Sequence, residues 1–277
     1  MRAAHLTGLV GAGGVGRSFL ARMPKLLGTL GPVKASSFRV ARRIVNTLGA
    51  GYAVSDYAAL KSSTLICVDV PESTLVRVIA ELAAHAPLEG SAVILCDSTR
   101  DSLWPNPLRA KGARVASLNA IPESNEQVFV AEGDPSAVDE LRRLAALDKR
   151  KLIELEPASK ALYFSGVHLA TNLLLPYIAG SVESLRAAGL TRSQATQVAQ
   201  TLGTRTLRDY GKAGRKAWNR DVAPALRRNV KEELDRIRGA DPHLADLYAR
   251  GVEQALAFFE PESITMKRIS ISKGGSR

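Results

Sequence analysis

A cluster of glycines near the amino terminus constrains this chain more than any other part of its sequence. The stretch GLVGAGGVGRSF at residues 8–19 holds five glycines in twelve positions. Glycine loses more conformational freedom on folding than any other residue, so such a cluster indicates a sharp turn or a group that approaches the backbone closely. A short apolar run precedes the glycines, and apolar residues at helical spacing follow them. The sequence therefore predicts a strand, a glycine-rich turn and a helix.

These glycines match the motif G-x-G-x-x-G. In a dinucleotide-binding fold the first glycine makes the tight turn, the second lets the pyrophosphate approach, and the third lets helix and strand pack closely. The following helix presents unpaired N–H groups to the phosphates. The alternative is a glycine-rich turn without a ligand. We expect the cofactor to bind at Gly11, Ala12, Gly13, Gly14, Val15 and Gly16.

Short β-rich runs alternate with helical patterns over the first 155 residues or so. Apolar residues three and four apart, as in STLVRVIAELAAH, separate the first strand candidates. Such alternation implies βαβ units and a mainly parallel sheet. Strands are expected at residues 5–10, 33–36, 64–68, 92–96, 114–118, 127–131 and 152–154.

The sequence after Pro157 predicts helices only. Residues 158–189 form one long, largely apolar helical pattern, with a kink expected at Pro176. Helix caps are expected at Gly189, Thr191 (with Gln194), Asp221 and Asp241, the last followed by Pro242 at a first helical position. We therefore expect an α/β dinucleotide-binding domain over residues 1–156, an all-α domain for substrate and dimerisation over 157–262, and a flexible basic tail over 263–277.

The second strand bears on which dinucleotide binds. No acid that could bind the ribose hydroxyls of NAD occurs between residues 33 and 45. Hydroxyl and guanidinium groups suit the 2′-phosphate of NADP, so we expect NADP to be preferred over NAD. Arg39 is by position the best single candidate for binding the 2′-phosphate. Arg42 and Arg43 also offer guanidinium groups, and the alternative interpretation is that they are merely exposed helix residues. The binding residues expected here are Ser36, Ser37 and Arg39.

The segment CVDVPESTL follows the strand expected at 64–68. Pro71 ends the strand at the carboxyl edge of the sheet, where ligands bind in open α/β folds. We expect Val70, Pro71 and Ser73 to face the cofactor, although Ser73 could instead cap the next helix.

Stretches along nearly the whole chain resemble a group of Rossmann-like proteins whose carboxyl-terminal half is an all-helical domain of unknown function. These proteins are relatives of pyrroline-5-carboxylate reductase, 3-hydroxyisobutyrate dehydrogenase and F420-dependent NADP reductase. The resemblance implies a nucleotide-binding, reductase-like protein that pairs with a second copy through its helical domain. It rests on GLVGAGGVGRSFL, SSFRVARRIVNTLGAG, LICVDVPESTLVRVIAELA, LRAKGARVASLNAIP, VFVAEGDPSAVDELRRL, KALYFSGVHLATNLLLPYIAGSVESLRAAGL, NRDV and ADPHLADLY.

Three positions depart from this group. Members commonly carry Ser-Gly, His-Pro and Tyr-His where this chain has Asp97-Ser98, Asn119-Ala120 and Tyr163-Phe164. Any role of those histidines in catalysis or substrate binding is therefore lost here.

The candidate catalytic residues lie after the strand at 114–118 and in the long helix. The resemblance implies that this helix contributes polar groups beside the nicotinamide. His168 and Asn172 share a helix face, and core polar side chains are the alternative interpretation for them. Asn119 can orient a carbonyl or the nicotinamide amide but cannot relay a proton. The catalytic candidates are Lys160, Tyr163, His168, Asn172 and Asn119.

Composition excludes several classes of protein. No apolar run is long enough to span a bilayer, and no Cys/His spacing indicates a metal site. Cys67 and Cys96 lie in apolar runs, as buried free thiols of a cytoplasmic protein would. The net charge of +11 is concentrated partly in residues 207–238, which contain ten Lys or Arg and five acidic residues. That stretch has few aromatic residues, so nucleic-acid binding ranks last.

The sequence thus favours a cytoplasmic, homodimeric, NADP-dependent oxidoreductase. Hydride transfer would join the cofactor to a small carbonyl, hydroxyl or imine substrate, with the helical domain closing the cleft. Tyr163, Lys160 or His168 would supply the proton. A non-catalytic NADP-binding sensor or scaffold is the alternative.

Overall fold

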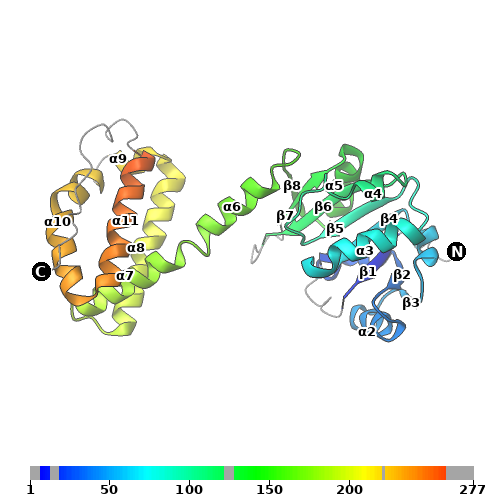
Figure 1. Ribbon diagram of the computed structural model, residues 1–277, viewed down its shortest axis with the longest axis horizontal. Coiled ribbons are helices and arrows are strands. Elements are labelled where there is room, and N and C mark those ends of the chain that lie inside the picture. Colours follow the sequence, from blue (N-terminus) through cyan, green and yellow to red (C-terminus); the bar gives the residue numbers. More distant parts are fainter. Residues whose placement is uncertain (1–6, 13–18, 122–127, 220–221, 260–277) are drawn as a thin grey trace, which may run out of the picture. The chain divides into compact units, whose positions relative to one another are not determined.

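A computed structural model describes residues 7–12, 19–121, 128–219 and 222–259 (Figure 1). The chain divides into two compact units, residues 1–166 and 167–277. The division falls within helix α6 (Lys160–Ala170). Each unit is described by itself.

The first unit is built on an eight-stranded sheet of order β3-β2-β1-β4-β5-β6-β7-β8. All neighbouring strands are parallel except β6 and β7, which pair antiparallel. The mainly parallel sheet predicted from the sequence is confirmed. Its strands are β1 (Thr7–Gly11), β2 (Leu30–Lys34), β3 (Tyr52–Val54), β4 (Leu65–Asp69), β5 (Ala92–Cys96), β6 (Arg114–Ala120), β7 (Val128–Gly133) and β8 (Lys151–Glu154).

Helices cover both faces of this sheet (Figure 1). On one face α2 (Phe38–Leu48) and α5 (Pro135–Leu147) bury Ile44 and Leu141 against alternate strand residues. On the other face lie α3 (Glu72–His85) and the single turn α4 (Asn106–Arg109). The central strands are therefore apolar on both sides, which explains their continuous hydrophobic runs. Cys67 and Cys96 are buried free thiols, as predicted.

The segment after the glycines differs from the single helix that its apolar spacing suggested. Its described part comprises a 3₁₀ turn (η2, Phe19–Arg22) and one α-helical turn (α1, Pro24–Leu27). Pro24 lacks an N–H and cannot continue a helix from the preceding turn, so the helical structure is interrupted at Met23. Leu20, Met23 and Leu26 are nevertheless buried, as their spacing indicated.

Two strand predictions also need correction. The strand predicted at residues 33–36 lies at Leu30–Lys34 instead. It ends before Ser36 because Ser37 already caps α2 through its side chain. The short β3 was not predicted. It has three residues at the sheet edge and lies between Gly51 and the 3₁₀ helix η3 (Tyr57–Ser62).

In its described residues the second unit contains helices only, which confirms the predicted fold class. Where one kinked helix was expected, α6 ends at Ala170 and α7 begins at Leu175. Pro176 lies at the start of α7, where its missing N–H costs nothing, whereas a continuous helix would bring its ring against the carbonyl four residues back. The helices are α7 (Leu175–Ala187), α8 (Arg192–Ala213), α9 (Lys216–Asn219), α10 (Val222–Ala240) and α11 (Pro242–Phe259).

Two of the predicted caps in this unit are confirmed. Thr191 and Gln194 form a reciprocal capping box, with the Gln194 N–H donating to Thr191 Oγ1 at 3.3 Å. Asp241 accepts the N–H of His243 at 2.8 Å at the start of α11. Gly189 has φ +101° just after the end of α7, while Asp221 lies outside the described residues. Within the described chain, no helix is long and apolar enough to cross a membrane.

Candidate functional site

A cavity of about 380 Å³ lies at the carboxyl ends of β1, β2 and β4 in the first unit. Residues 10–12, 34–36 and 70–71 form its floor and sides. These segments leave adjacent parallel strands at the same sheet edge, so their backbones converge there. Thr74, Val78 and other residues of α3 close one side. In open α/β sheets this edge is the usual place for a ligand.

Positive charge predominates in the cavity. Among the described lining residues, Lys34, Arg43 and Arg77 are cationic and Glu81 is acidic. The Lys34 Nζ donates to a neighbouring backbone carbonyl at 2.6 Å and lies 4.8 Å from the centre of the Tyr57 ring. Glu81 accepts a hydrogen bond from the Tyr57 hydroxyl at 3.0 Å and pairs with Arg77 at 3.8 Å. Burial, together with this bond, raises the pKa of Tyr57. The cavity therefore suits an anionic ligand.

Five of the cofactor residues predicted from the sequence line this cavity: Gly11, Ala12, Ser36, Val70 and Pro71. The backbone of the Gly-rich turn enters at Ala12, whose N–H donates to the Asp69 carbonyl at 3.0 Å. The rest of that motif, namely Gly13, Gly14, Val15 and Gly16, lies outside the described residues.

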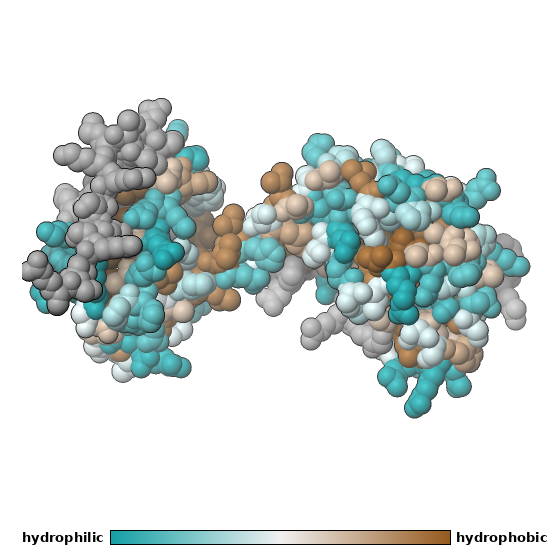
Figure 2. Space-filling model, viewed as in Figure 1, coloured by the Kyte–Doolittle hydropathy of each residue, from teal (hydrophilic) through white to brown (hydrophobic). Residues whose placement is uncertain are grey.

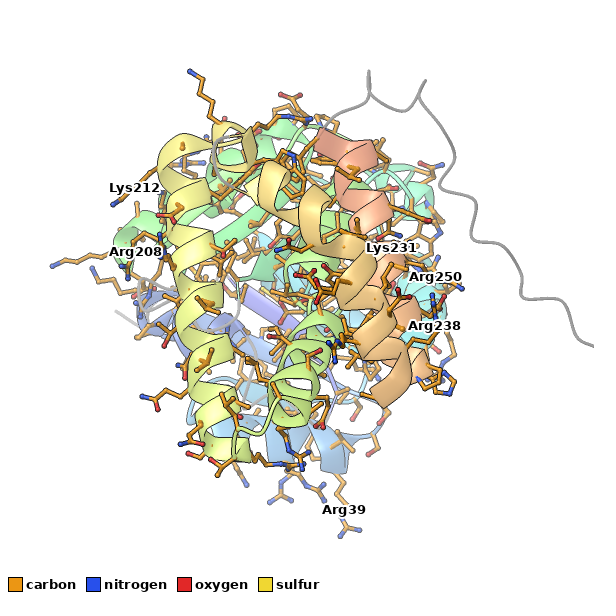
Figure 3. All side chains as sticks on the ribbon, turned by 90° about the vertical axis from the view of Figure 1, so that its left-hand side faces the viewer. Arg39, Arg208, Lys212, Lys231, Arg238 and Arg250 are labelled. Carbon is orange, nitrogen blue, oxygen red and sulfur yellow. The ribbon has the colours of Figure 1, made fainter. Side chains whose placement is uncertain are left out.

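The other predicted cofactor residues lie elsewhere. The Ser37 side chain accepts the N–H of Val40 at 3.3 Å and so caps α2. Arg39 is exposed and projects outward from its helix (Figure 3); it belongs to an open surface depression on α2 rather than to the cavity. Ser73 is exposed in the first turn of α3, and Pro71 occupies the N-cap, so Ser73 does not cap that helix.

A second group of polar side chains lies farther along the same sheet edge. Glu72, the first residue of α3, accepts hydrogen bonds from the Ser98 hydroxyl (3.1 Å), the Thr99 N–H (3.3 Å) and the Arg100 Nε (2.9 Å). The Asn119 amide, buried, donates to the Ser98 carbonyl at 3.0 Å. These bonds tie the loop after β5 to α3 and to β6. Asn119 is therefore held in one orientation.

Asp97 lies at the start of this loop with φ +52°, a left-handed conformation that Asp tolerates better than most residues. Its carboxylate accepts the N–H of Ala120 at 3.1 Å. It acts here as a turn residue at the end of β5.

Lys160, the first residue of α6, has an unusual environment. Its side chain is only 2% exposed, and its Nζ has no hydrogen-bond partner among the described residues. Burial lowers the pKa of Lys160 to about 8, although the carboxylates of Glu132, Glu72, Asp101 and Asp97 act in the opposite direction. An ionisable group perturbed by burial beside charged partners is typical of functional sites.

The remaining catalytic candidates lie on α6 and just beyond it. Tyr163 is half-buried, and burial raises its pKa. Its ring packs edge-to-face with that of Phe164, with the ring centroids 5.2 Å apart. His168 and Asn172 are joined at 3.1 Å between Nδ1 and Nδ2. Both are exposed in this chain, so they do not lie in the core of a single copy. Lys160, Tyr163 and Asn119 belong to the first unit, whereas His168 and Asn172 belong to the second.

Sequence reasoning missed Lys34, Arg77 and Glu132 as site residues. Arg77 lies one turn after Thr74 on the helix that borders the cavity. That position could have been found by asking which residues of α3 point toward the carboxyl edge. Within the described chain, no group of three or more His, Cys, Asp or Glu side chains is placed to hold a metal ion.

The fold of the first unit is Rossmann-like, and a comparison with protein families identifies part of the chain. Residues 127–254 match the family model described as "Domain of unknown function (DUF2520)". The matched residues run from the end of the sheet through most of the helical unit. No curated protein is significantly similar to the chain.

Solved structures with the same fold extend over nearly the whole chain. An imine reductase variant from Myxococcus stipitatus in complex with NAD+ is 13% identical, with a TM-score of 0.64 and coverage of 92% of this chain and 95% of that one. A reductive aminase from Aspergillus terreus in complex with NADPH and ethyl-5-oxohexanoate is 14% identical, with a TM-score of 0.60 and coverage of 90% and 93%. Pyrroline-5-carboxylate reductase from Coxiella burnetii is 12% identical, with a TM-score of 0.55 and coverage of 93% and 98%. At these identities the likeness establishes the fold.

Proposed function

We propose that this protein is an NADP-dependent oxidoreductase that reduces or oxidises a small carbonyl, hydroxyl or imine substrate. The observation that carries the proposal is the cationic cavity at the carboxyl ends of β1, β2 and β4. Proteins of the same fold were solved with NAD+ or NADPH, and two of those named above act on imines or pyrroline-5-carboxylate.

The residues of the cavity fit the adenosine end of NADP. The backbone at Gly11 and Ala12 leads into the cavity without a long side chain, and Ser36 offers a hydroxyl at the end of β2. Lys34 and Arg43 supply positive charge without an acid in the second strand, whereas a carboxylate there would repel a 2′-phosphate. Guanidinium groups bind phosphate with charge-assisted hydrogen bonds.

The second polar group would serve the reacting end. A bound nicotinamide supplies or accepts the hydride. Asn119, fixed by the Ser98 carbonyl, can orient an amide or carbonyl by hydrogen bonding. Lys160 and Tyr163 are the candidate proton donors of the first unit, and the lowered pKa of Lys160 makes its ammonium a better acid near neutral pH. His168 is the candidate donor of the second unit.

Calorimetric titration with NADPH and NADH tests the binding half of this proposal. We expect NADPH to bind more tightly than NADH, since the cavity carries more cations than its acid can neutralise. Absence of heat with either nucleotide would overturn the proposal. NADPH oxidation with ketones, keto acids and cyclic imines then tests catalysis.

A non-catalytic NADP sensor or scaffold is the second candidate. Asn119 and Phe164 stand where the resembling proteins commonly have histidines, which favours this reading. Tight NADPH binding without turnover of any substrate in the panel would support it. The buried free thiols Cys67 and Cys96 support a reducing compartment, and we place the protein in the cytoplasm.

We also propose that a second copy of the chain packs against the helical unit. Among its described apolar residues only Ala195, Ala245 and Val252 are buried. Large apolar side chains of α6, α7 and α8 are exposed instead, and Figure 2 shows apolar surface along α6 and the start of α7. The comparable exposed residues of the sheet unit are scattered over separate elements. The helical surface therefore best matches itself, as a two-fold homodimer requires.

Replacing Leu173 with glutamate is expected to convert the dimer into a monomer. Leu173 is 55% exposed beside the start of α7, so a buried charge there would oppose association. Light scattering after size-exclusion chromatography measures the mass. The control is Leu147→Glu, at a residue that is 53% exposed on α5 and should leave the mass unchanged. A monomeric unmodified chain would contradict the proposal.

The exposed basic residues of the helical unit are dispersed. Figure 3 shows Arg208 and Lys212 on α8, away from Lys231 and Arg238 on α10 and Arg250 on α11. Arg238 and Arg250 also pair with acids on their own helices. Binding of nucleic acid stays the lowest-ranked candidate, and a steep salt dependence with random DNA would promote it.

A further inference from the structure

Four buried polar atoms gather around Glu132 in the first unit. Ser102 Oγ, Ser117 Oγ, Glu132 Oε2 and Lys160 Nζ have no hydrogen-bond partner among the described residues. Their residues are between 0% and 2% exposed. An unsatisfied buried polar atom costs about 1–3 kcal/mol, so four of them in one place require an explanation.

The backbone brings these four side chains to one locus. Ser117 and Glu132 are direct partners across the antiparallel strands β6 and β7, so their side chains share a sheet face. The other carboxylate oxygen of Glu132 accepts the Ser102 N–H at 2.7 Å. Among the carboxylates near Lys160, that of Glu132 has the strongest effect on its ammonium. Even so, no hydrogen bond or ion pair joins Lys160 directly to Glu132.

The four atoms complement one water molecule. The ammonium donates, the carboxylate accepts, and each hydroxyl can do either. A water molecule donates two hydrogen bonds and accepts two, and buried waters commonly bind two to four otherwise unsatisfied polar groups. Direct pairing would leave both hydroxyls without partners, whereas a bridging water satisfies all four.

We propose that Lys160, Glu132, Ser102 and Ser117 bind a single buried water, and that Glu132 acts through it as the positioning residue of Lys160. The bridge ties the first residue of α6 to β7 and, through Ser102, to the loop after β5. That loop also carries Ser98, whose carbonyl holds Asn119. The same bridge thus fixes two of the candidate catalytic residues. Only the catalytic meaning of this arrangement rests on the proposed function; the bridge itself does not.

Carboxylates on three neighbouring segments act on Lys160. Glu132 comes from β7, Glu72 from α3, and Asp97 and Asp101 from the loop after β5. Glu72 is already occupied by Arg100 at 2.9 Å and by Ser98. Glu132, by contrast, keeps one oxygen for the lysine. Removing its charge should therefore affect Lys160 more than removing that of Glu72.

The test is NMR titration of Lys160 in the full chain labelled with ¹³C at lysine Cε, with its signal assigned by Lys160→Arg. Glu132→Gln retains the carbonyl that accepts the Ser102 N–H but removes the charge. We expect it to lower the pKa of Lys160 by about 1 or more, because loss of a nearby opposite charge, here one water molecule away, changes a pKa by roughly that amount. Glu72→Gln should have a smaller effect.

Ser117→Ala should also lower the pKa of Lys160, because it removes one partner of the water. The matched control is Ser63→Ala, which removes another buried, unpartnered hydroxyl away from this locus and should leave the titration unchanged. An unaltered titration in Glu132→Gln or, should that variant not fold, in Ser117→Ala overturns the proposal. Because the titration needs no nucleotide, its failure is distinguishable from failure to bind NADPH.

Discussion

Replacing Arg43 with alanine is expected to weaken NADPH binding about 10- to 100-fold and to leave NADH binding nearly unchanged. Arg43 lines the cavity from α2, across from the end of β2 where Ser36 lies. A hydrogen bond to a charged group contributes about 1.5–3 kcal/mol, and each 1.4 kcal/mol corresponds to about a tenfold change in affinity. NADH lacks the 2′-phosphate, so it loses little when the guanidinium is removed. Calorimetric titration of both nucleotides measures the change in preference.

Arg39→Ala is the matched control for this prediction. It removes the same kind of side chain one turn earlier on the same helix; both arginines are exposed and line the depression on α2, but only Arg43 also lines the cavity. We expect both nucleotides to bind this variant as they bind the unmodified protein. A selective loss of NADPH affinity in Arg39→Ala would favour the candidate chosen from the sequence. An equal loss of NADH and NADPH in Arg43→Ala would instead indicate a general role in folding or charge.

The architecture could be predicted because strand and helix patterns are local properties of the sequence. The run AVILC at residues 92–96 is apolar throughout, and β5 occupies those five residues. Thr191 and Gln194 indicate the start of a helix, because their own side chains form the capping box. In both cases neighbouring residues contain the whole signal, so no knowledge of distant contacts is required.

The details of the site depend on contacts that the sequence does not reveal. Arg39 and Arg43 lie four residues apart, on the same face of one helix, and only the position of that helix along the sheet edge decides which of them reaches the cavity. Glu132 was overlooked because an acid near the end of a strand usually faces solvent. Its burial follows from the antiparallel pairing of β7 with β6, which places it opposite Ser117. Such pairings join segments that are distant in the sequence.

Replacing Lys160 and Glu132 together, by Lys160→Met and Glu132→Gln, is expected to stabilise the first unit by about 3 kcal/mol at pH 7. Burial lowers the pKa of Lys160 from 10.5 to about 8, and each pKa unit corresponds to about 1.36 kcal/mol. Methionine fills a similar volume without a charge, and replacing a buried ionic pair by uncharged residues often stabilises a protein. Changing both residues avoids leaving the Glu132 carboxylate buried without its lysine.

The gain should depend on pH in a definite direction. Below pH 8 Lys160 is protonated in the folded and unfolded states, so the unmodified protein bears the full cost of burying the charge. Between pH 8 and 10.5 the unfolded chain binds more protons at this residue, so its contribution to stability rises with pH. The advantage of the double variant is therefore complete below pH 8 and disappears by about pH 10.5.

Urea unfolding followed by the fluorescence of Trp104, with Trp218→Phe in both proteins, reports the first unit. Lys61→Met, at an exposed lysine, should change stability little at any pH. Equal stability of the double variant and the unmodified protein at pH 7 would mean that Lys160 carries no buried charge. A protein that retains such a costly lysine at a candidate catalytic position is expected to lose turnover when the lysine is replaced, because stability and activity commonly oppose each other at functional sites.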